Sequence, residues 1–323
     1  MKKGKKIALI AAGCMILVGL VMAAGGLAAA RFDVSGLNTV SLETNTYEIE
    51  EAFHHISIDG AGSDVRLYPW EEDTCKVVCT EEDDVTFEVE VKDDTLHIVR
   101  HNSGVRILHF GVFLEETGIS VYLPEKAYGS LVILTSSGNV TVPEEFQFAS
   151  ADVRSTSGEI KMLASIGGSL SAQSQSGNIQ VGNASPETLE AKSTSGEITI
   201  EAVKTKAEIQ VKSTSGDVTL TDVEGKAIAA TTTSGEITLS RVVLAENIQL
   251  KSTSGDIELR DSDGAELSIQ TTSGKVSGTL LSEKIFRIDT TSGDTNVPPS
   301  ASGGKCEVTT RSGDVDFQII PAK

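Results

Sequence analysis

Carboxylates that could bind a cation recur directly after a repeated Ser-Gly dipeptide. They include Glu159, Glu197, Asp217, Glu236 and Asp256. If the repeats stack, these side chains form a column of like charges, and a hard divalent cation such as Ca²⁺ between them would relieve the repulsion. The competing interpretation is a solvated acidic face, balanced by Lys or Arg four residues before several of the glycines. The sequence favours the solvated face and keeps the calcium ridge as a hypothesis.

Catalysis is the second chemistry to weigh, because carboxylates on adjacent coils of a solenoid would lie about 5 Å apart, close to the separation in a retaining glycosidase. An active site should interrupt a uniform repeat with loops and aromatic or basic groups. From residue 131 to residue 323 there is no His, Trp or Tyr, and no insertion longer than one residue. The repeated serines cannot each be a nucleophile. We therefore predict no enzyme, no catalytic residue and no cofactor.

The element behind these columns is an internal repeat of 19–20 residues. Such a fixed period is the signature of a repeat architecture. The glycines of its ten Ser-Gly dipeptides are Gly138, Gly158, Gly177, Gly196, Gly216, Gly235, Gly255, Gly274, Gly293 and Gly313.

Each repeat has the alternation of a half-buried strand on both sides of its glycine. Leu189 and Ala191 stand seven and five residues before Gly196, and Ile198 and Ile200 stand two and four after it. One such unit buries little alone, so equivalent strands should stack in parallel. The sequence predicts an all-β fold, a parallel β-solenoid of about ten coils in which each strand lies beside its counterpart in the next repeat.

The repeated dipeptide predicts a structural corner. Gly would supply either a positive φ or a close approach that a Cβ would obstruct. All ten repeats have Ser or Thr three residues before the glycine, in the inward phase of the strand. We expect these hydroxyls to form hydrogen bonds along the stack.

The N-terminus predicts a membrane anchor. Residues 1–6 are a basic tail, placed in the cytoplasm, and residues 7–30 contain no charge and no Pro, enough for one transmembrane helix. The alternative is a cleaved signal, since Ala28-Ala29-Ala30 is a small-residue site. Both interpretations place the remainder outside the cytoplasm. The favoured anchor gives a single-pass cell-membrane protein with an extracytoplasmic C-terminal domain.

The remaining chain divides into a linker at 31–49, a β-rich cap with degenerate coils at 50–130 and the regular solenoid at 131–323. The stretch from Gly60 to Leu67 is expected to be a degenerate coil, and Phe317–Pro321 a weaker cap at the other end. Cysteines show no disulfide or zinc spacing. We expect them to be buried, unpaired thiols.

The order of these segments resembles the DUF4097 family, the β-strand-repeat proteins of bacterial envelopes that carry an adhesin label. The resemblance rests on the membrane segment, the unit from Ile58 to Leu67, Val121-Tyr122-Leu123-Pro124 and the serial Ser-Gly-acidic coils. It covers essentially residues 50–320. It implies a surface β-solenoid, sometimes associated with envelope-stress loci, and offers no catalytic residues.

Together these features predict an adhesin-like binding or structural scaffold at the bacterial cell surface. Its partner would be an unidentified surface polymer or envelope protein, and its contact with the membrane would be the N-terminal helix. A net charge of −19 argues against nucleic acid. Two alternatives remain: an accessory of an envelope-stress response that acts through a membrane partner, and a polysaccharide-processing enzyme.

Overall fold

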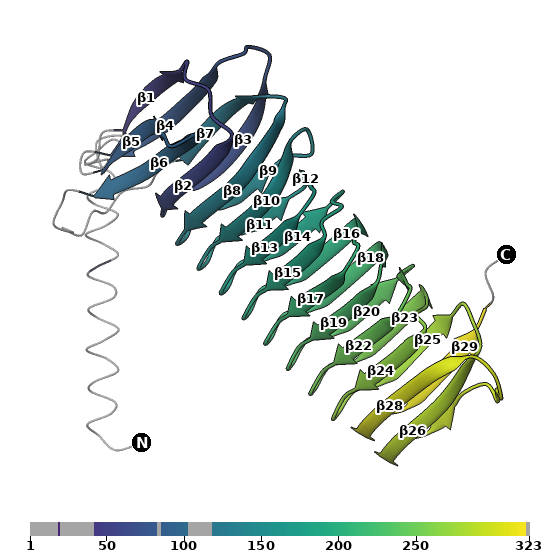
Figure 1. Cartoon of the computed structure of the whole chain (residues 1–323). Helices are drawn as coiled ribbons and strands as arrows, with labels where there is room; N and C mark the ends of the chain where they lie inside the picture. The colour runs from purple at the N-terminus through teal and green to yellow at the C-terminus, as the bar shows by residue number, and fades with distance from the viewer. Residues whose placement is uncertain (1–18, 20–41, 83–84, 103–117, 321–323) are drawn as a thin grey trace, which may run out of the picture.

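A computed structural model describes residue 19 and residues 42–82, 85–102 and 118–320 of the chain. From residue 42 onward every described element is a β-strand, and the strands wind into an elongated stack of coils (Figure 1). The predicted parallel β-solenoid is confirmed. No helix among the described residues is long and apolar enough to cross a membrane, and the predicted transmembrane helix at 7–30 lies, except for residue 19, outside them.

Two long sheets form the opposite walls of the stack. Sheet A contains, in spatial order, β1 (Leu42–Ile49), β4 (Cys75–Glu82), β7 (Gly118–Pro124), β3 (Asp64–Trp70), β9 (Val140–Val142), β11 (Ile160–Met162), β14 (Ile179–Gly182), β16 (Ile198–Lys204), β18 (Val218–Gly225), β20 (Ile237–Ser240), β23 (Ile257–Ser262), β25 (Val276–Leu280), β29 (Val315–Ile319) and β27 (Thr295–Asn296), with β21 (Val243–Leu244) also paired to β18. Sheet B contains β26 (Lys284–Ser292), β28 (Gly304–Ser312), β24 (Glu266–Gln270), β22 (Asn247–Lys251), β19 (Ala227–Thr231), β17 (Glu208–Lys212), β15 (Thr188–Lys192), β13 (Ser169–Gln173), β10 (Gln147–Arg154), β8 (Ala127–Thr135), β2 (His55–Ala61), β6 (Thr95–Asn102) and β5 (Val85–Lys92), with β12 (Ser165–Ile166) also paired to β10.

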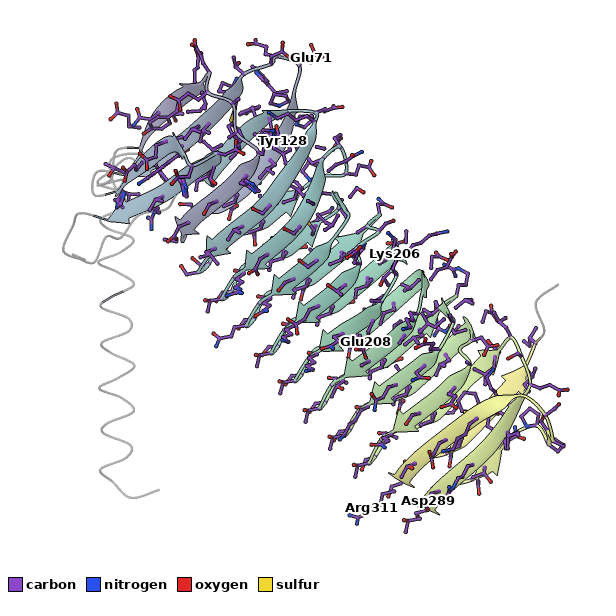
Figure 2. All side chains as sticks on the ribbon, in the orientation of Figure 1. Glu71, Tyr128, Lys206, Glu208, Asp289 and Arg311 are labelled. Atoms are coloured by element: carbon purple, nitrogen blue, oxygen red, sulfur yellow. The ribbon has the colours of Figure 1, made fainter. Side chains whose placement is uncertain are left out.

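The core lies between the two sheets and follows the predicted alternation. Ile209 and Val211 of β17 are fully buried, while Gln210 between them is partly exposed. The parallel register places Ile209 beside Ile228 of the next coil, so each apolar column is continuous. Side chains project from the strands along the whole stack (Figure 2). Burial of these continuous columns is the main favourable contribution to folding.

The N-terminal part is a cap in which strand order departs from sequence order. The coil β2–β3 is inserted between β6–β7 and β8–β9. Ser63 takes the place of the corner glycine there, since Val65 pairs with Val140, so the predicted degenerate coil is confirmed. Strands β1, β4 and β5 are antiparallel to their neighbours. Residues 42–49, expected to be linker, are strand β1, because the strand completes the antiparallel end of sheet A.

The C-terminal end contains the second departure. Strand β24 pairs with β28, and β28 then pairs with β26. The coil of Gly313 therefore lies inside the stack, and the coil of Gly293 is the terminal one. The expectation that every repeat lies beside its sequence neighbour was wrong here. The weaker cap expected from Phe317 onward was also wrong, because Phe317 belongs to the inserted coil and is buried.

A second corner, six residues after the glycine, has a left-handed backbone in five successive coils. Its φ angles lie between 48° and 54°. The residues are Asn183, Ala202, Asp222, Arg241 and Asp261. Asn and Asp adopt this conformation readily, whereas Ala and Arg do so at a cost of about 1–2 kcal/mol. This corner has no constant residue type, so the sequence gives no sign of it.

We predict that Gly216→Ala destabilises the protein by at least about 3 kcal/mol, because the added Cβ would lie 1.9 Å from the backbone oxygen of Gly196. Urea unfolding followed by circular dichroism measures the change. The matched control at the opposite corner is Ala202→Gly, which relieves a positive φ. It should leave stability unchanged or raise it by up to about 1 kcal/mol. Equal losses in both variants would contradict the assignment.

Candidate functional surface

The corner glycines are required because successive coils touch through their backbones. A Cβ built at Gly177, Gly196 or Gly216 would lie within 2.0 Å of the carbonyl oxygen of the preceding glycine in the stack. Among the described residues the only glycine with a positive φ is Gly303. Of the two reasons that the sequence allowed, close approach is therefore the correct one for the corner.

Inward hydroxyls connect each corner to the one before it. The N–H of Gly196 donates to Ser193 Oγ at 2.9 Å, and Ser193 Oγ donates to the carbonyl oxygen of Gly177 at 3.3 Å. The same pair of bonds occurs at Ser174 and Ser252. These serines are buried, so the predicted hydrogen-bonded ladder is confirmed and its hydroxyls are structural.

The residues that follow the glycines form one exposed column. It contains all five predicted ridge residues: Glu159, Glu197, Asp217, Glu236 and Asp256. Short Asn or Asp side chains alternate with longer ones from Asn139 to Lys275. The short side chain accepts a hydrogen bond from the backbone N–H of the next coil, for example from Glu236 to Asp217 Oδ1 at 2.8 Å. The residue types display this alternation, but it was not among the features predicted from the sequence.

This column does not contain a preformed metal cage. In the ranges that the structure describes, no group of three or more His, Cys, Asp or Glu side chains is arranged to hold a metal ion. Asp217 and Asp256 each use one oxygen on a backbone N–H. The geometry therefore gives the short carboxylates a structural role, and the calcium ridge stays a prediction.

Two exposed hydroxyl residues precede the buried glycine in most coils. Examples are Thr194 and Ser195, and Thr214 and Ser215. With the acidic column they form a surface that we call the corner ridge: the two residues before and the one residue after each glycine from Gly138 to Gly274. The ridge repeats once per coil, at about 4.8 Å.

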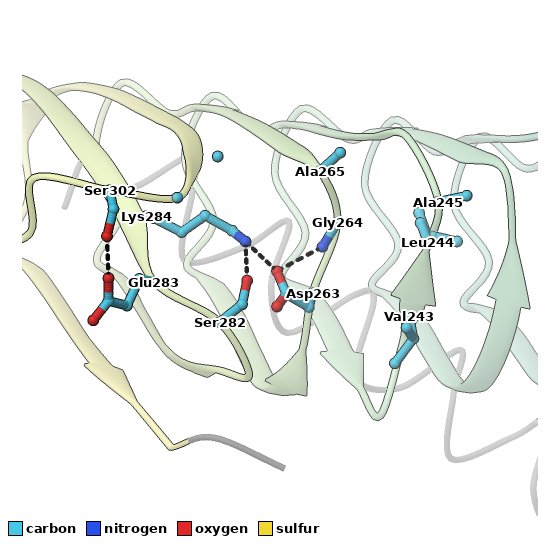
Figure 3. Close-up of a pocket in the computed structure, with 12 residues that line it drawn as sticks. Val243, Leu244, Ala245, Asp263, Gly264, Ala265, Ser282, Glu283, Lys284 and Ser302 are labelled. Carbon is cyan, nitrogen blue, oxygen red and sulfur yellow. Dashed lines mark hydrogen bonds and ion pairs between the residues drawn. The ribbon is translucent and has the colours of Figure 1, made fainter.

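The return side of the last coils contains a buried ion pair (Figure 3). Lys284 Nζ lies 2.6 Å from Asp263 Oδ1 and forms a hydrogen bond with Ser282. The lysine is only 2% exposed. It belongs to the terminal coil and extends past Gly304 of the inserted coil, where no side chain blocks its path. An open pocket of about 680 Å³ adjoins the pair. Because the ammonium is paired with a carboxylate, its role is to attach the terminal coil.

A cluster of aromatic rings lies on the outer face of sheet A in the cap. Tyr68 and Tyr122 stack with centroids 5.0 Å apart, and Trp70 meets Tyr122 edge-on at 5.4 Å. Lys76 Nζ lies 3.7 Å from the Trp70 centroid and 4.4 Å from that of Tyr122. The lysine thus occupies ring surface that a sugar would need.

The described cysteines and the exposed His54 add no reactive group. Cys75 and Cys306 are buried free thiols, as predicted, and Cys79 is also buried. Burial raises the pKa of Cys75 and of Cys306 to about 12, so both are protonated at neutral pH. His54 pairs with Asp94 on the surface at 2.9 Å and lowers the pKa of that carboxyl. The geometry supports a structural surface with no activated nucleophile among these groups.

The sequence matches the Toastrack DUF4097 family over residues 53–263 and again over residues 235–320. The chain belongs to this family. Comparison with curated proteins finds no match.

Solved structures of several bacterial proteins align with most of this chain. A protein of Parabacteroides distasonis named a putative lipid binding protein has a TM-score of 0.47 and 14% identity, covering 87% of this chain and 98% of its own. A putative adhesin of Parabacteroides merdae has a TM-score of 0.45 and 16% identity, and the match covers 87% of this chain and 97% of that protein. A putative adhesin of Bacteroides fragilis has a TM-score of 0.41 and 12% identity, and the match covers 86% of this chain and 97% of that protein.

We predict that Asp217→Ala lowers the free energy of unfolding by about 1 kcal/mol, because it removes the acceptor for the Glu236 N–H. Glu236→Ala, in the next coil of the same column, should change it by less than about 0.5 kcal/mol. Urea denaturation of both variants measures the difference. Equal effects would show that the alternation of short and long side chains has no structural meaning.

For the acidic column we expect no rise in melting temperature when millimolar calcium is added to the full chain. A cation bound only by the folded state would raise it by mass action. Differential scanning calorimetry with calcium and with chelator decides the point. A rise that Glu197→Gln and Glu236→Gln together abolish would establish the calcium ridge instead.

Proposed function

We propose that this protein is a membrane-anchored, outward-facing scaffold that binds an extended surface polymer or envelope protein along its corner ridge. The observation that carries the proposal is the unbroken periodicity of that ridge. Thr194, Thr214, Thr233, Thr253 and Thr272 occupy equivalent exposed positions in successive coils. An extended partner can make the same contact many times on such a surface, so weak contacts add through multivalency.

Anchoring is the second part of the proposal. Residues 7–30 supply an uncharged segment of membrane-spanning length, and Lys2, Lys3, Lys5 and Lys6 precede it. This arrangement favours a cytoplasmic N-terminus and an extracytoplasmic solenoid. Family membership agrees with an envelope scaffold, and we assign no catalytic role and no cofactor. The corner ridge then faces the cell exterior.

The test is binding of the full chain, purified in detergent, to isolated cell-wall and capsular polymers immobilised on a sensor surface. A ridge variant, Thr214→Lys with Thr233→Lys, places two bulky charges on adjacent coils and should weaken binding at least tenfold. The control is Thr221→Lys, which adds the same group to the outer face of β18. Protease treatment of intact cells checks orientation, because an extracytoplasmic solenoid must be accessible.

Loss of binding in the control but not in the ridge variant would contradict the assignment of the surface. Absence of binding to every polymer, together with crosslinking to a single membrane protein, would favour the envelope-stress accessory instead. Protection of the solenoid in intact cells would contradict the proposed location.

A further inference from the structure

The terminal coil leaves one long strand edge open. In the described part of the chain β26 pairs with β28 on one side and has no strand on the other. The strand spans nine residues and contains no Pro. Its partner in the same coil, β27, has only two residues and is followed by Pro298 and Pro299, which lack the N–H that pairing needs. The edge of sheet A is therefore blocked, and that of sheet B is not.

The apolar core is also incomplete at this end. Phe286 and Ile288 continue the columns of Leu267 and Ile269, which are 2% and 0% exposed. Phe286 and Ile288 themselves are only partly buried, although Phe286 packs on Phe317 at 5.6 Å. Ile285 on the outer face is 46% exposed. Natural proteins usually protect such an edge, because exposed strands pair with other chains.

The charges on β26 indicate which partner fits. Arg287 and Asp289 lie on either side of Ile288 and share the outer face, where both are exposed. Asp289 is labelled in Figure 2. When two copies of β26 pair antiparallel about Ile288, each Arg287 faces Asp289 of the other copy. Ile288 then faces its own counterpart, and Phe286 faces Thr290. Opposite charges directly across an antiparallel pair are favourable, and like charges are unfavourable.

We propose that the occupant of this edge is a second copy of the same chain, paired through β26 about a twofold axis. Such an isologous contact closes at two copies, because the β26 edge of each copy is then paired. It continues sheet B across the junction and covers the half-buried Phe286 and Ile288. The two caps then lie at opposite ends, since the cap and β26 are at opposite ends of each solenoid (Figure 1).

The dimer itself does not depend on the proposed function, but its consequence does. If each solenoid is anchored through the N-terminal segment that precedes its cap, the anchored ends of the dimer are its two caps, which lie at opposite ends. The pair would then join two membranes tip to tip, which is a homotypic adhesive contact. Failure of anchoring would remove this consequence and leave the dimer in place.

Sedimentation velocity of the full chain in a non-denaturing detergent measures the association. We expect a concentration-dependent monomer–dimer equilibrium. Asp289→Arg should weaken it at least tenfold, because the twofold axis makes two Arg–Arg contacts at once. Arg287→Glu should act similarly, and the double variant Arg287→Glu/Asp289→Arg should restore dimerisation. The matched control is Lys251→Glu, a charge reversal at the position of an inner coil equivalent to Asp289.

Circular dichroism melting of each variant separates loss of pairing from loss of fold, since Arg287 also lies 3.7 Å from Glu307 of its own chain. A chain that is monomeric at about 100 μM would overturn the proposal. So would a dimer that neither single reversal weakens, open-ended filaments, or a double variant that stays monomeric while folded. Cell fractionation tests anchoring independently of all these outcomes.

Discussion

The contact on which the structure depends is the approach of one corner backbone to the next along the stack. No Cβ fits between Gly216 and the carbonyl oxygen of Gly196, and the same holds at each corner from Gly158 to Gly274. This contact fixes where every coil begins and ends. It places Ser or Thr where the hydroxyl can reach both its own glycine N–H and the preceding glycine oxygen. The period of the sequence follows from this corner, and the apolar columns follow from the period.

Both ends of the solenoid depart from the simple rule that sequence neighbours are spatial neighbours. At the C-terminus, Lys284 extends over Gly304 to the Asp263 carboxylate and attaches the terminal coil to a coil two positions away. Separating a buried charge from its partner is costly, so this pair favours one arrangement of the last two coils. The buried Oγ1 atoms of Thr290 and Thr310 have no hydrogen-bond partner. The hydroxyl ladder therefore does not continue through the reordered coils.

Much of the fold could be predicted from sequence because the repeat encodes it directly. The inward columns, the buried hydroxyls and the degenerate coil at Gly60–Leu67 all follow from types and spacing. The order of the last two coils could not be predicted, because the units of Gly293 and Gly313 both have apolar residues in the inward columns before the glycine. After the glycine they differ, since Thr295 stands in the position of Val315. The contact that favours the observed order is a long lysine opposite a glycine, which has no local signature. The left-handed corner at Ala202 and Arg241 could not be predicted from the sequence either, since neither residue type favours that conformation.

The same regularity shapes the surface. Each coil contributes exposed hydroxyls, and a column of alternately short and long polar residues follows the glycines.

The most direct test of the stacking account is a crosslink that reports the order of the coils. In the structure Gln270 lies beside Thr309, and Asp289 lies beside Thr309 on its other side.

Oxidation of Gln270→Cys/Thr309→Cys should therefore give an intramolecular disulfide, because strands are about 4.8 Å apart. Gln270→Cys/Asp289→Cys should give none, since two strand spacings exceed the reach of a disulfide. A disulfide in the second variant and none in the first would show that the coils follow sequence order, and would contradict the account.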